Sequence, residues 1–583
     1  MQLEGNQPIW DVQPTKAFGQ KFWLGLALLT VTAIAIASLF WLGAHPFSTN
    51  WDEGRYVNRA YRDVAAFRQG GVLELLKAVI GEDRTRPPAY RLLVLPVTLL
   101  LGAKPLLLRL VGLACMGLSV WLTFLMAKRI AGPTAGAFAV VFLTLCPIVV
   151  APSLRFYVDY PYYLAIAATL YFLLASWDQD EPSRNWIGLG VSLGLGALAK
   201  PPFFFLMAPV GLLTLGLVWF KWIAAPRLSS LVKACILGTL IALPWWIFNV
   251  KPGLAKALRS SGYVRHSLGA RGSPEAIGNW FYTFVQTLLG PALTLLFVAI
   301  VATVALRLVQ KRLQLERFQL TAIALFLTAS LPTLITSIFA TNQNPRLIAP
   351  ALLPLAIAIG ALAALTGWTT SRWLAAAATV LFCFQLAVMV SPTPGEPRYQ
   401  AGDSASKSNV LLWGNPSVVM RRSEQWDWSK LREVTIAQNI RVPSIGYLGN
   451  GGGLAAPQLA FPWVEANEPI EVRWLWRFED NLPNGGNENT PPNWTQVMAS
   501  VNASNVVVTA LNVSGSAADK QDIDNRYNAE LIERMRQRPE FLGPVELKLG
   551  RFNPARVLVF LRKSESSIVT SDNPKPKYLE ALY

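Results

Sequence analysis

Two adjacent carboxylates, Asp52 and Glu53, stand between a long apolar stretch and an amphipathic stretch that runs from Tyr56 to Gln69. A carboxylate in this position can take a proton from an acceptor hydroxyl, and two together can hold a divalent metal. An acidic residue in the first turn of a helix can also serve simply as a cap. The pair therefore indicates general-base or metal chemistry, with helix capping as the alternative.

Cationic side chains are concentrated in two loops, residues 43–104 and 250–278, that we expect on the same membrane face as these carboxylates. They are Arg55, Arg59, Arg62, Arg68, Lys77, Arg84, Arg86, Arg91 and Lys104 in the first loop, and Lys251, Lys256, Arg259, Arg265 and Arg271 in the second. Fixed cations bind phosphate groups. These cations therefore indicate that the outer face binds an anionic ligand. The alternative is that long loops are partly exempt from the charge bias of membrane proteins, so the cations need no ligand.

Other metal-binding residue types give no sign of a metal site. The four cysteines all lie in apolar stretches, and the two histidines, His45 and His266, are far apart in the sequence. We therefore expect neither a disulfide framework nor a histidine-rich metal centre.

These residues must be positioned by membrane-spanning helices. The chain of 583 residues is 52% hydrophobic and 15% charged, with a mean hydropathy of +0.35, which excludes an ordinary soluble domain. Apolar stretches long enough to cross a bilayer recur from about residue 20 to 392. About eleven spans are expected, at residues 22–42, 105–127, 134–153, 160–177, 185–200, 202–220, 230–249, 279–306, 318–339, 346–366 and 372–391. The fold class is therefore a mainly α polytopic transmembrane bundle, with residues 1–392 forming the catalytic part.

The distribution of charge predicts the orientation. Residues 1–392 hold 31 Lys and Arg against 14 Asp and Glu, whereas residues 393–583 hold 21 of each. With the spans above, the short basic loops share the side of the N-terminus, as cytoplasmic loops do. Residues 88–101 carry Arg91 and Pro96 and are short for a span, so we expect an interfacial or re-entrant helix there. The loops 43–104 and 250–278 and the C-terminal part then face the non-cytoplasmic side.

The C-terminal part has a soluble α/β pattern. Residues 393–430 are expected to form a linker and an amphipathic segment, and residues 431–583 a soluble α/β domain on the non-cytoplasmic side. Strands are expected at 444–448, 471–477, 505–511, 545–549 and 556–561, and helices at 429–438 and 528–538. The glycine run that follows Gly446 fits a dinucleotide-binding loop poorly. Three glycosylation-type motifs, at Asn493, Asn502 and Asn512, imply nothing about activity.

Several short motifs follow one another along residues 20–392. They are Asp52-Glu53-x-x-Tyr56, Arg86-Pro87-Pro88-x-Tyr90, Arg109, Arg155, Asp159-Tyr160-Pro161, Lys200-Pro201 and Asn344-Pro345-Arg346. In this order they resemble the polytopic membrane glycosyltransferases of GT-C type that use lipid-linked sugars, a group that includes protein O-mannosyltransferases and the bacterial aminoarabinose transferase of lipid A. At Arg86 the family usually has His or Lys, and a guanidinium binds phosphate at least as well.

The resemblance implies roles for these residues. Asp52 would be the catalytic base, supported by Glu53, with Asp159 at the same cavity. The donor phosphate would be contacted by cations from several elements, namely Arg86, Lys200, Arg346, Arg55, Arg109 and Arg155. Tyr56 and Tyr90 would line the sugar or lipid pocket. The alternative for each cation is a residue at the membrane interface whose long side chain extends its charged end into water.

The implied reaction moves a sugar from a polyprenyl-phosphate donor to a lipid, glycan or protein acceptor at the outer face of the plasma membrane. The expected partners are this donor, the acceptor and membrane lipids, with no nucleic acid. No cofactor is expected to be required, and a divalent metal at Asp52 and Glu53 is the alternative.

Two other functional classes are alternatives to a transferase. The span count also allows a transporter or flippase of a lipid-linked or anionic substrate, but such proteins usually keep ionisable groups near the bilayer midplane. Here the charged groups gather at the ends of the expected spans. A non-catalytic scaffold would leave the arrangement of Asp52, Glu53 and Arg86 unexplained.

Overall fold

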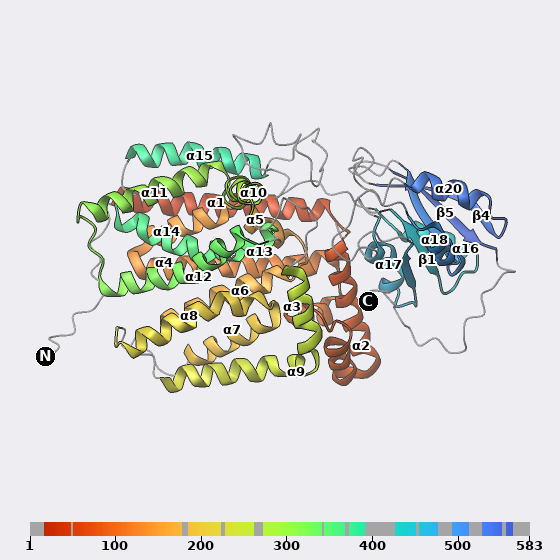
Figure 1. Cartoon of the computed structure of the whole chain (residues 1–583), viewed down its shortest axis with the longest axis horizontal. Coiled ribbons are helices and arrows are strands. Elements are labelled where there is room, and N and C mark those ends of the chain that lie inside the picture. The colour runs from red at the N-terminus through yellow and green to blue at the C-terminus, as the bar shows by residue number, and fades with distance from the viewer. Residues whose placement is uncertain are drawn as a thin grey trace.

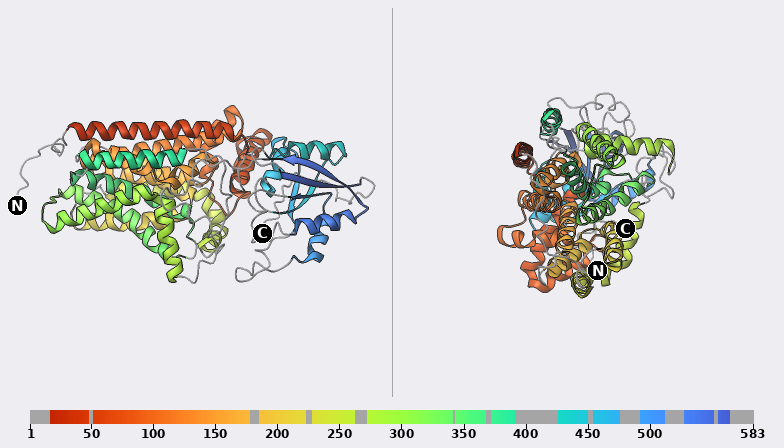
Figure 2. Two further views of the ribbon diagram at one scale, coloured as in Figure 1. Left: turned by 90° about the horizontal axis from the view of Figure 1, so that it is seen from above. Right: turned by 90° about the vertical axis from the view of Figure 1, so that its left-hand side faces the viewer.

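The computed structural model describes residues 17–47, 51–177, 185–222, 228–261, 272–340, 343–367, 372–390, 426–449, 454–475, 492–511, 527–550 and 555–563. Figure 1 shows a bundle of long helices beside a small sheet with its own helices. In Figures 1 and 2, α1 begins at the end of the bundle farthest from the sheet. The expected mainly helical fold with a C-terminal α/β unit is confirmed.

The bundle contains both long helices and short turns. In chain order they are α1 (Ala17–Ala44), α2 (Trp51–Gly81), α3 (Ala89–Leu101), α4 (Pro105–Thr144), α5 (Pro147–Val150), η1 (Ala151–Leu154), α6 (Asp159–Ala175), α7 (Asn185–Ala199), α8 (Pro202–Trp219), α9 (Leu228–Ser261), α10 (Pro274–Thr283), η2 (Phe284–Leu289), α11 (Pro291–Val309), α12 (Arg317–Ile338), α13 (Pro345–Ile348), η3 (Ala349–Ala351), α14 (Leu352–Leu365) and α15 (Arg372–Val390). Seven of these helices are long and apolar enough to cross a membrane. They are α1, α4, α8, α9, α11, α12 and the run from α13 to α14.

Helix α4 is two helices joined by a sharp bend. Ala131 and Gly132 leave helical geometry, and Gly132 has a φ of 82°, which glycine adopts without strain. Gly136 packs against Phe124, so the chain turns back on itself after the bend. The two halves correspond to the expected spans 105–127 and 134–153, although the second helix ends at Thr144 and short turns follow it.

The expected single span at 279–306 is wrong. Gly290 has a φ of 81° and is followed by Pro291, so α10 and the π-helical turn η2 end there and α11 begins afresh. A left-handed glycine followed by proline, which has no backbone N–H, ends the helix. Helices α6 and α7, with 17 and 15 residues, and the apolar part of α15 are shorter than the helices counted as candidate spans.

Helices α2 and α3 lie at the end of the bundle next to the sheet, where α2 runs across the direction of the long helices (Figure 1). Helix α2 bends at Gly70 and Gly71. Helix α3 has 13 residues, about 20 Å of helix, which is too short to cross a hydrocarbon core of about 30 Å. Arg91 in α3 is buried and pairs with Asp63 of α2. This pair joins the two helices.

The C-terminal unit is a five-stranded sheet with helices. Its elements are α16 (Ser429–Ala437), β1 (Ser444–Leu448), α17 (Ala456–Glu465), β2 (Glu471–Trp474), α18 (Trp494–Asn502), β3 (Val506–Leu511), α20 (Asn528–Arg536), β4 (Phe541–Leu549) and β5 (Ala555–Arg562). The strand order is β2-β1-β3-β5-β4, with β1 parallel to β2 and β3, and β5 antiparallel to β3 and β4. The five expected strands are present, whereas α17 and α18 were not anticipated.

Helix α17 joins the sheet unit to α2. The side-chain amide of Asn58 donates to the carbonyl oxygen of Pro457 at 2.8 Å, and the rings of Tyr61 and Phe461 meet edge to face at 5.4 Å. Asn58 is buried. The helix that carries Asp52 in its first turn is therefore also the helix that the C-terminal unit contacts.

Candidate active site

Five charged side chains form a continuous chain of ion pairs at the sheet-facing end of the bundle. Arg86 contacts one oxygen of Asp52 at 3.6 Å, and Arg346 contacts the other at 3.3 Å. Arg346 also reaches Asp159 at 2.6 Å, and Lys200 contacts the second oxygen of Asp159 at 2.6 Å. Residues separated by up to 294 positions in sequence are thus linked at one place.

Each of these side chains is placed by the end of a helix. Asp52 lies in the first turn of α2, and Asp159 is the first residue of α6. Arg346 lies in the short helix α13, whose first turn is capped by the side chain of Asn344 accepting from the Arg346 amide at 3.0 Å. Arg86 lies in the loop between α2 and α3. Lys200 follows α7, directly before the two prolines that start α8.

Exposure distinguishes the two carboxylates. The Asp159 side chain is fully buried, whereas the Asp52 side chain is 37% exposed. The three cations lie between these extremes, and Arg346 is 26% exposed. Of the two acids, Asp52 is therefore the one that a substrate can reach.

The electrostatic balance keeps Asp52 ionised. The surrounding protein disfavours its charged form, but the guanidinium groups of Arg346 and Arg86 outweigh this and hold the pKa of Asp52 below its ordinary value. Three cations stand against two carboxylates, so the chain of ion pairs keeps one positive charge. This excess positive charge favours the binding of an anion.

Tyrosine rings lie beneath the cations. The guanidinium carbon of Arg346 is 4.0 Å from the ring centre of Tyr157, and that of Arg86 is 5.4 Å from the ring centre of Tyr56. Such contacts hold a cation without neutralising it. Among the described residues, Nη1 of Arg86 and Nε of Arg346 are buried donors without a hydrogen-bond partner. These free donors favour an additional acceptor at the site.

Glu53 does not share the surroundings of Asp52. It is fully buried, and its two oxygens accept from Arg109 at 2.7 and 3.0 Å. The backbone amide of Phe156 donates to the same carboxylate at 2.9 Å. Arg109 also donates to the backbone carbonyls of His45 and Phe47. Glu53 and Arg109 therefore tie the start of α2 to α4 and to the segment before α6.

Four further expected residues lie outside the chain of ion pairs. Arg155 stands over the ring of Trp41 at 5.4 Å, and Arg55 is half-buried on α2. Tyr90 is buried and its hydroxyl accepts from Arg59 at 3.4 Å. The predicted pocket residue Tyr56 is likewise buried, beneath Arg86. Of the predicted residues, the structure brings together Asp52, Arg86, Asp159, Lys200 and Arg346.

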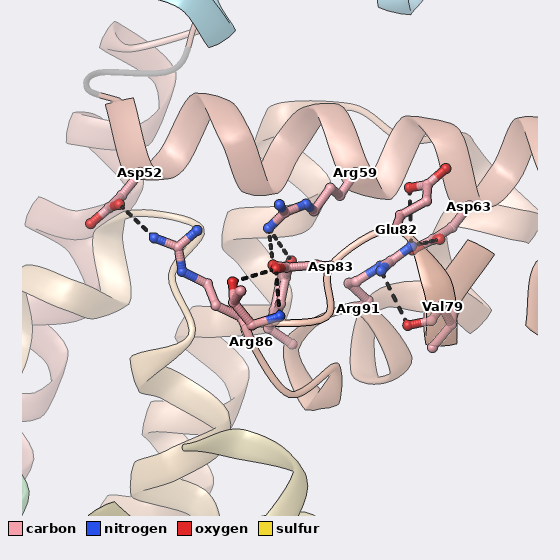
Figure 3. A network of polar contacts seen from close by, with 10 residues as sticks. Asp52, Arg59, Asp63, Val79, Glu82, Asp83, Arg86 and Arg91 are labelled. Atoms are coloured by element: carbon pink, nitrogen blue, oxygen red, sulfur yellow. Dashed lines mark hydrogen bonds and ion pairs between the residues drawn. The ribbon is translucent and has the colours of Figure 1, made fainter. Parts of the chain in front are cut away.

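Sequence analysis missed two buried ion pairs beside the site, Arg59 with Asp83 and Arg91 with Asp63 (Figure 3). A signal was present, because Asp63 and Asp83 are acidic residues within a strongly basic loop. An isolated acid among arginines is expected to pair with one of them.

The oxygens of Asp52 and Glu53, the alternative metal site, all face arginines. Both oxygens of Asp52 already contact arginines, and both oxygens of Glu53 contact Arg109. Within the described part of the chain, no group of three or more His, Cys, Asp or Glu side chains is placed to hold a metal ion.

The bundle can be compared with known proteins. Residues 85–248 match the model of a family described as dolichyl-phosphate-mannose-protein mannosyltransferase. The structure is similar to that of ArnT from Cupriavidus metallidurans in the apo state, with a TM-score of 0.52 and 14% identity over 92% of this chain and 98% of that chain. The same protein bound to undecaprenyl phosphate gives a TM-score of 0.50 with the same identity and coverage. No curated protein matches this chain by sequence.

Residues 85–248 thus resemble this mannosyltransferase family, and most of the chain shares the fold of ArnT. The resemblance stated from the motifs is confirmed, and so are the fold class and the multi-pass membrane character of the chain. The matched residues 85–248 include Arg86, Asp159 and Lys200, whereas Asp52 and Arg346 lie outside them. The ion pairs connect Asp52 and Arg346 to these three matched residues.

Proposed function

We propose that the transferase moves a sugar from a polyprenyl-phosphate donor to an acceptor hydroxyl or amine, with Asp52 as the base. The observation that carries this proposal is the open carboxylate of Asp52 held between Arg86 and Arg346. A base lies directly beside cations that can bind a leaving phosphate. One structure of the similar protein ArnT contains bound undecaprenyl phosphate, which agrees with this donor class.

The charge of the site supports a monophosphate donor. A polyprenyl-phosphate sugar is a phosphodiester with one negative charge, which matches the single excess positive charge of the ion-pair chain. A diphosphate donor would bring two negative charges and leave an excess of one. Matching charge inside a partly buried site avoids the cost of an unpaired ion.

The proposed reaction leaves the total charge of the site unchanged. The acceptor oxygen or nitrogen bonds to the anomeric carbon while the bond from this carbon to the phosphate oxygen breaks, and its electron pair stays on the phosphate. The acceptor proton passes to Asp52. The lipid phosphate gains one negative charge as the carboxylate loses one, so Arg86, Arg346 and Lys200 face the new charge without a change in the total. Cations aimed at developing charge stabilise the transition state more than the ground state.

We assign the other expected residues to support of this centre. Asp159 aligns Arg346 and Lys200 through its two oxygens. Glu53 and Arg109 fix the first turn of α2. Arg55 and Arg155 add positive charge near the site, and Tyr56 and Tyr90 shape the wall beneath Arg86. The chemistry requires no metal, because the protein's own cations stabilise the leaving group.

We further infer that the reaction takes place on the non-cytoplasmic side of the cell membrane. Arg317 donates to the carbonyl of Lys221 at 2.9 Å, and α11 ends with Arg307 in its last turn, at the end of the bundle away from the sheet (Figure 1). Cytoplasmic loops are rich in Lys and Arg. We therefore infer that the end that carries Asp52 and the C-terminal unit faces the opposite side.

The division of the chain is part of the proposal. Residues 1–392 form the catalytic membrane part with outer loops 43–104 and 250–278, residues 393–430 link it to the C-terminal domain, and residues 431–583 form that domain. Most of 393–430 lies outside the described residues, as do parts of the second loop. The contact of α17 with α2 supports a C-terminal domain that stands beside the outer cavity and takes part in acceptor selection.

Release of polyprenyl phosphate tests the proposal. The purified full chain in detergent is incubated with radiolabelled polyprenyl-phosphate sugars and cell-envelope extract, and wild type is compared with Asp52→Asn. We expect release by wild type and a loss of at least 100-fold in the variant, as for removal of a positioned base. Equal release by both proteins would exclude Asp52 as the base, and no release with any donor would exclude the donor class.

A further inference from the structure

The loop that carries Arg86 is anchored to α2 by a buried ion pair. Arg59 of α2 pairs with Asp83 of the loop, and the two side chains are only 7% and 2% exposed (Figure 3). Because both partners are withdrawn from water, breaking one side leaves an uncompensated buried charge. Loss of one partner therefore costs much more than it does in a surface ion pair.

Asp83 also shapes the backbone just before Arg86. Its Oδ1 accepts from the amide of Thr85 at 3.3 Å and from the Thr85 hydroxyl at 2.8 Å. This is the local bonding by which an Asp fixes a turn. Pro87 follows Arg86 and restricts its backbone from the other side. The direction in which Arg86 leaves the loop is thus set at both neighbours.

The side chain of Arg86 returns to the same helix that anchors the loop. Its guanidinium contacts Asp52 at 3.6 Å and lies over the ring of Tyr56. Asp52 and Arg59 stand about two helical turns apart on α2. One helix therefore holds the base, the ring beneath the cation, and the anchor of the loop that supplies the cation.

We propose that Arg59 and Asp83 are positioning residues that place the Arg86 guanidinium between Asp52 and the donor phosphate. This rests on the proposed function, in which Arg86 binds the phosphate and Asp52 is the base. Neither Arg59 nor Asp83 touches the substrate. They act by fixing the loop from residue 82 to 88 on α2.

A displacement of Arg86 should be detectable as a change in the pKa of Asp52. The charged groups that face Asp52 are Arg86 from the loop, Arg346 from α13 and Asp159 from α6, together with the hydroxyls of Tyr56 and Tyr157. Moving Arg86 away removes one of the two cations that lower the pKa of Asp52, so that pKa rises. The acid limb of the pH profile then moves to higher pH, because the base becomes protonated earlier.

A second buried pair on α2 offers a matched control. Asp63 and Arg91 are 3% and 1% exposed and are joined by a 2.8 Å hydrogen bond from Nε. This pair connects α2 to α3, and Arg91 also contacts Glu82 at the start of the loop at 3.6 Å. Its loss weakens the fold but leaves the bonds of Asp83 to Arg59 and Thr85 in place.

The experiment compares two double variants of the full chain purified in detergent, Arg59→Gln/Asp83→Asn and Asp63→Asn/Arg91→Gln. Each keeps the net charge of the protein. Measured are KM and kcat for the polyprenyl-phosphate sugar, the pH dependence of kcat/KM, the Kd for undecaprenyl phosphate as a probe, and Tm. For the Arg59/Asp83 variant we expect KM and Kd to rise about tenfold, the size of one lost charge-assisted hydrogen bond, and the acid limb to move to higher pH.

The Asp63/Arg91 variant should lose a similar amount of Tm with its acid limb and Kd unchanged. The same acid limb in all three proteins, or equal shifts in both variants, would overturn the positioning role. Thr85→Val serves where the double variant does not fold, because it removes only one hydroxyl bond to Asp83. It should shift KM and the acid limb in the same direction by a smaller factor, and no shift would count against the proposal.

A failure of the proposed function can be distinguished from a failure of this inference. If wild type releases no polyprenyl phosphate, or Asp52→Asn keeps full activity, that function is wrong whatever the anchor variants do. The Kd for undecaprenyl phosphate reports the position of Arg86 without turnover. A Kd that is unchanged in the Arg59/Asp83 variant overturns the inference even where the activity assay succeeds.

Discussion

At the scale of single residues, the site depends on which of two neighbouring acids is exposed. Asp52 and Glu53 are adjacent in sequence, yet Asp52 is 37% exposed and Glu53 is fully buried against Arg109. Consecutive residues of a helix point about 100° apart, so one can serve the substrate while the other holds the fold. The motif identified both acids, but sequence alone does not reveal which side of the helix a short pair presents.

The pH profile of the enzyme should report the cations around Asp52. Since Arg346 and Arg86 lower its pKa, the ionised base persists to low pH, and the acid limb of kcat/KM in wild type should lie below about pH 4, the ordinary range of Asp. Arg346→Gln removes the stronger of the two cations and should move that limb upward. Arg346→Lys keeps the charge and should move it less. A limb that stays fixed in Arg346→Gln would show that another group titrates.

At the scale of elements, the sequence predicts best where glycine or proline marks an end. The bend at Ala131 and Gly132 separates two expected spans, and the five strands of the C-terminal sheet were recognised from apolar alternation. Gly290 and Pro291 lie within a run so apolar that they were read as the interior of one span. Helix α17 was missed because Pro457 and Pro462 weaken its helical pattern, although Pro457 stands in the first turn, where proline is tolerated.

A close contact between two helices of the bundle predicts a sensitive glycine. Helices α4 and α14 meet at Gly360, where an added Cβ would stand 2.6 Å from the backbone oxygen of Ala135. A backbone atom cannot move aside as a side chain can, so Gly360→Ala should lower the free energy of unfolding by about 1–3 kcal/mol. Gly211 in α8 has no atom within 4 Å of the same position and serves as the control. Thermal unfolding in detergent should show a lower Tm for Gly360→Ala and an unchanged or higher Tm for Gly211→Ala.

At the scale of the whole molecule, α2 is where the membrane bundle and the C-terminal unit meet. Buried polar contacts tie it to α4 through Glu53, to the Arg86 loop through Arg59, to α3 through Asp63 and to α17 through Asn58. Acidic residues in a basic loop signal that ion pairs form, but the sequence does not show which residues pair, because their proximity depends on the complete fold. The family resemblance could indicate which residues share the cavity, but the contacts that hold them there required the structure.

The junction with α17 makes a prediction about dynamics. Asn58→Ala removes the hydrogen bond to the Pro457 carbonyl in a buried contact and should weaken docking by about 1 kcal/mol. Tyr61→Phe keeps the ring contact with Phe461 and loses only an exposed 3.4 Å bond to Glu465, so it should have little effect. Hydrogen exchange of the full chain should show faster exchange in α17 for Asn58→Ala alone. Equal exchange rates in wild type and both variants would exclude this bond as a determinant of docking.

The crosswise course of α2 at the end of the bundle has a consequence for how substrate is found. The proposed base, Asp52, lies on a helix that runs across the ends of spanning helices, so it would stay at one depth, near the headgroup plane. A lipid-borne donor already carries its phosphate at that depth, so its search for the enzyme is lateral diffusion in two dimensions. The encounter rate then follows the number of donor molecules per unit of membrane area, and dilution of the surrounding medium leaves it unchanged.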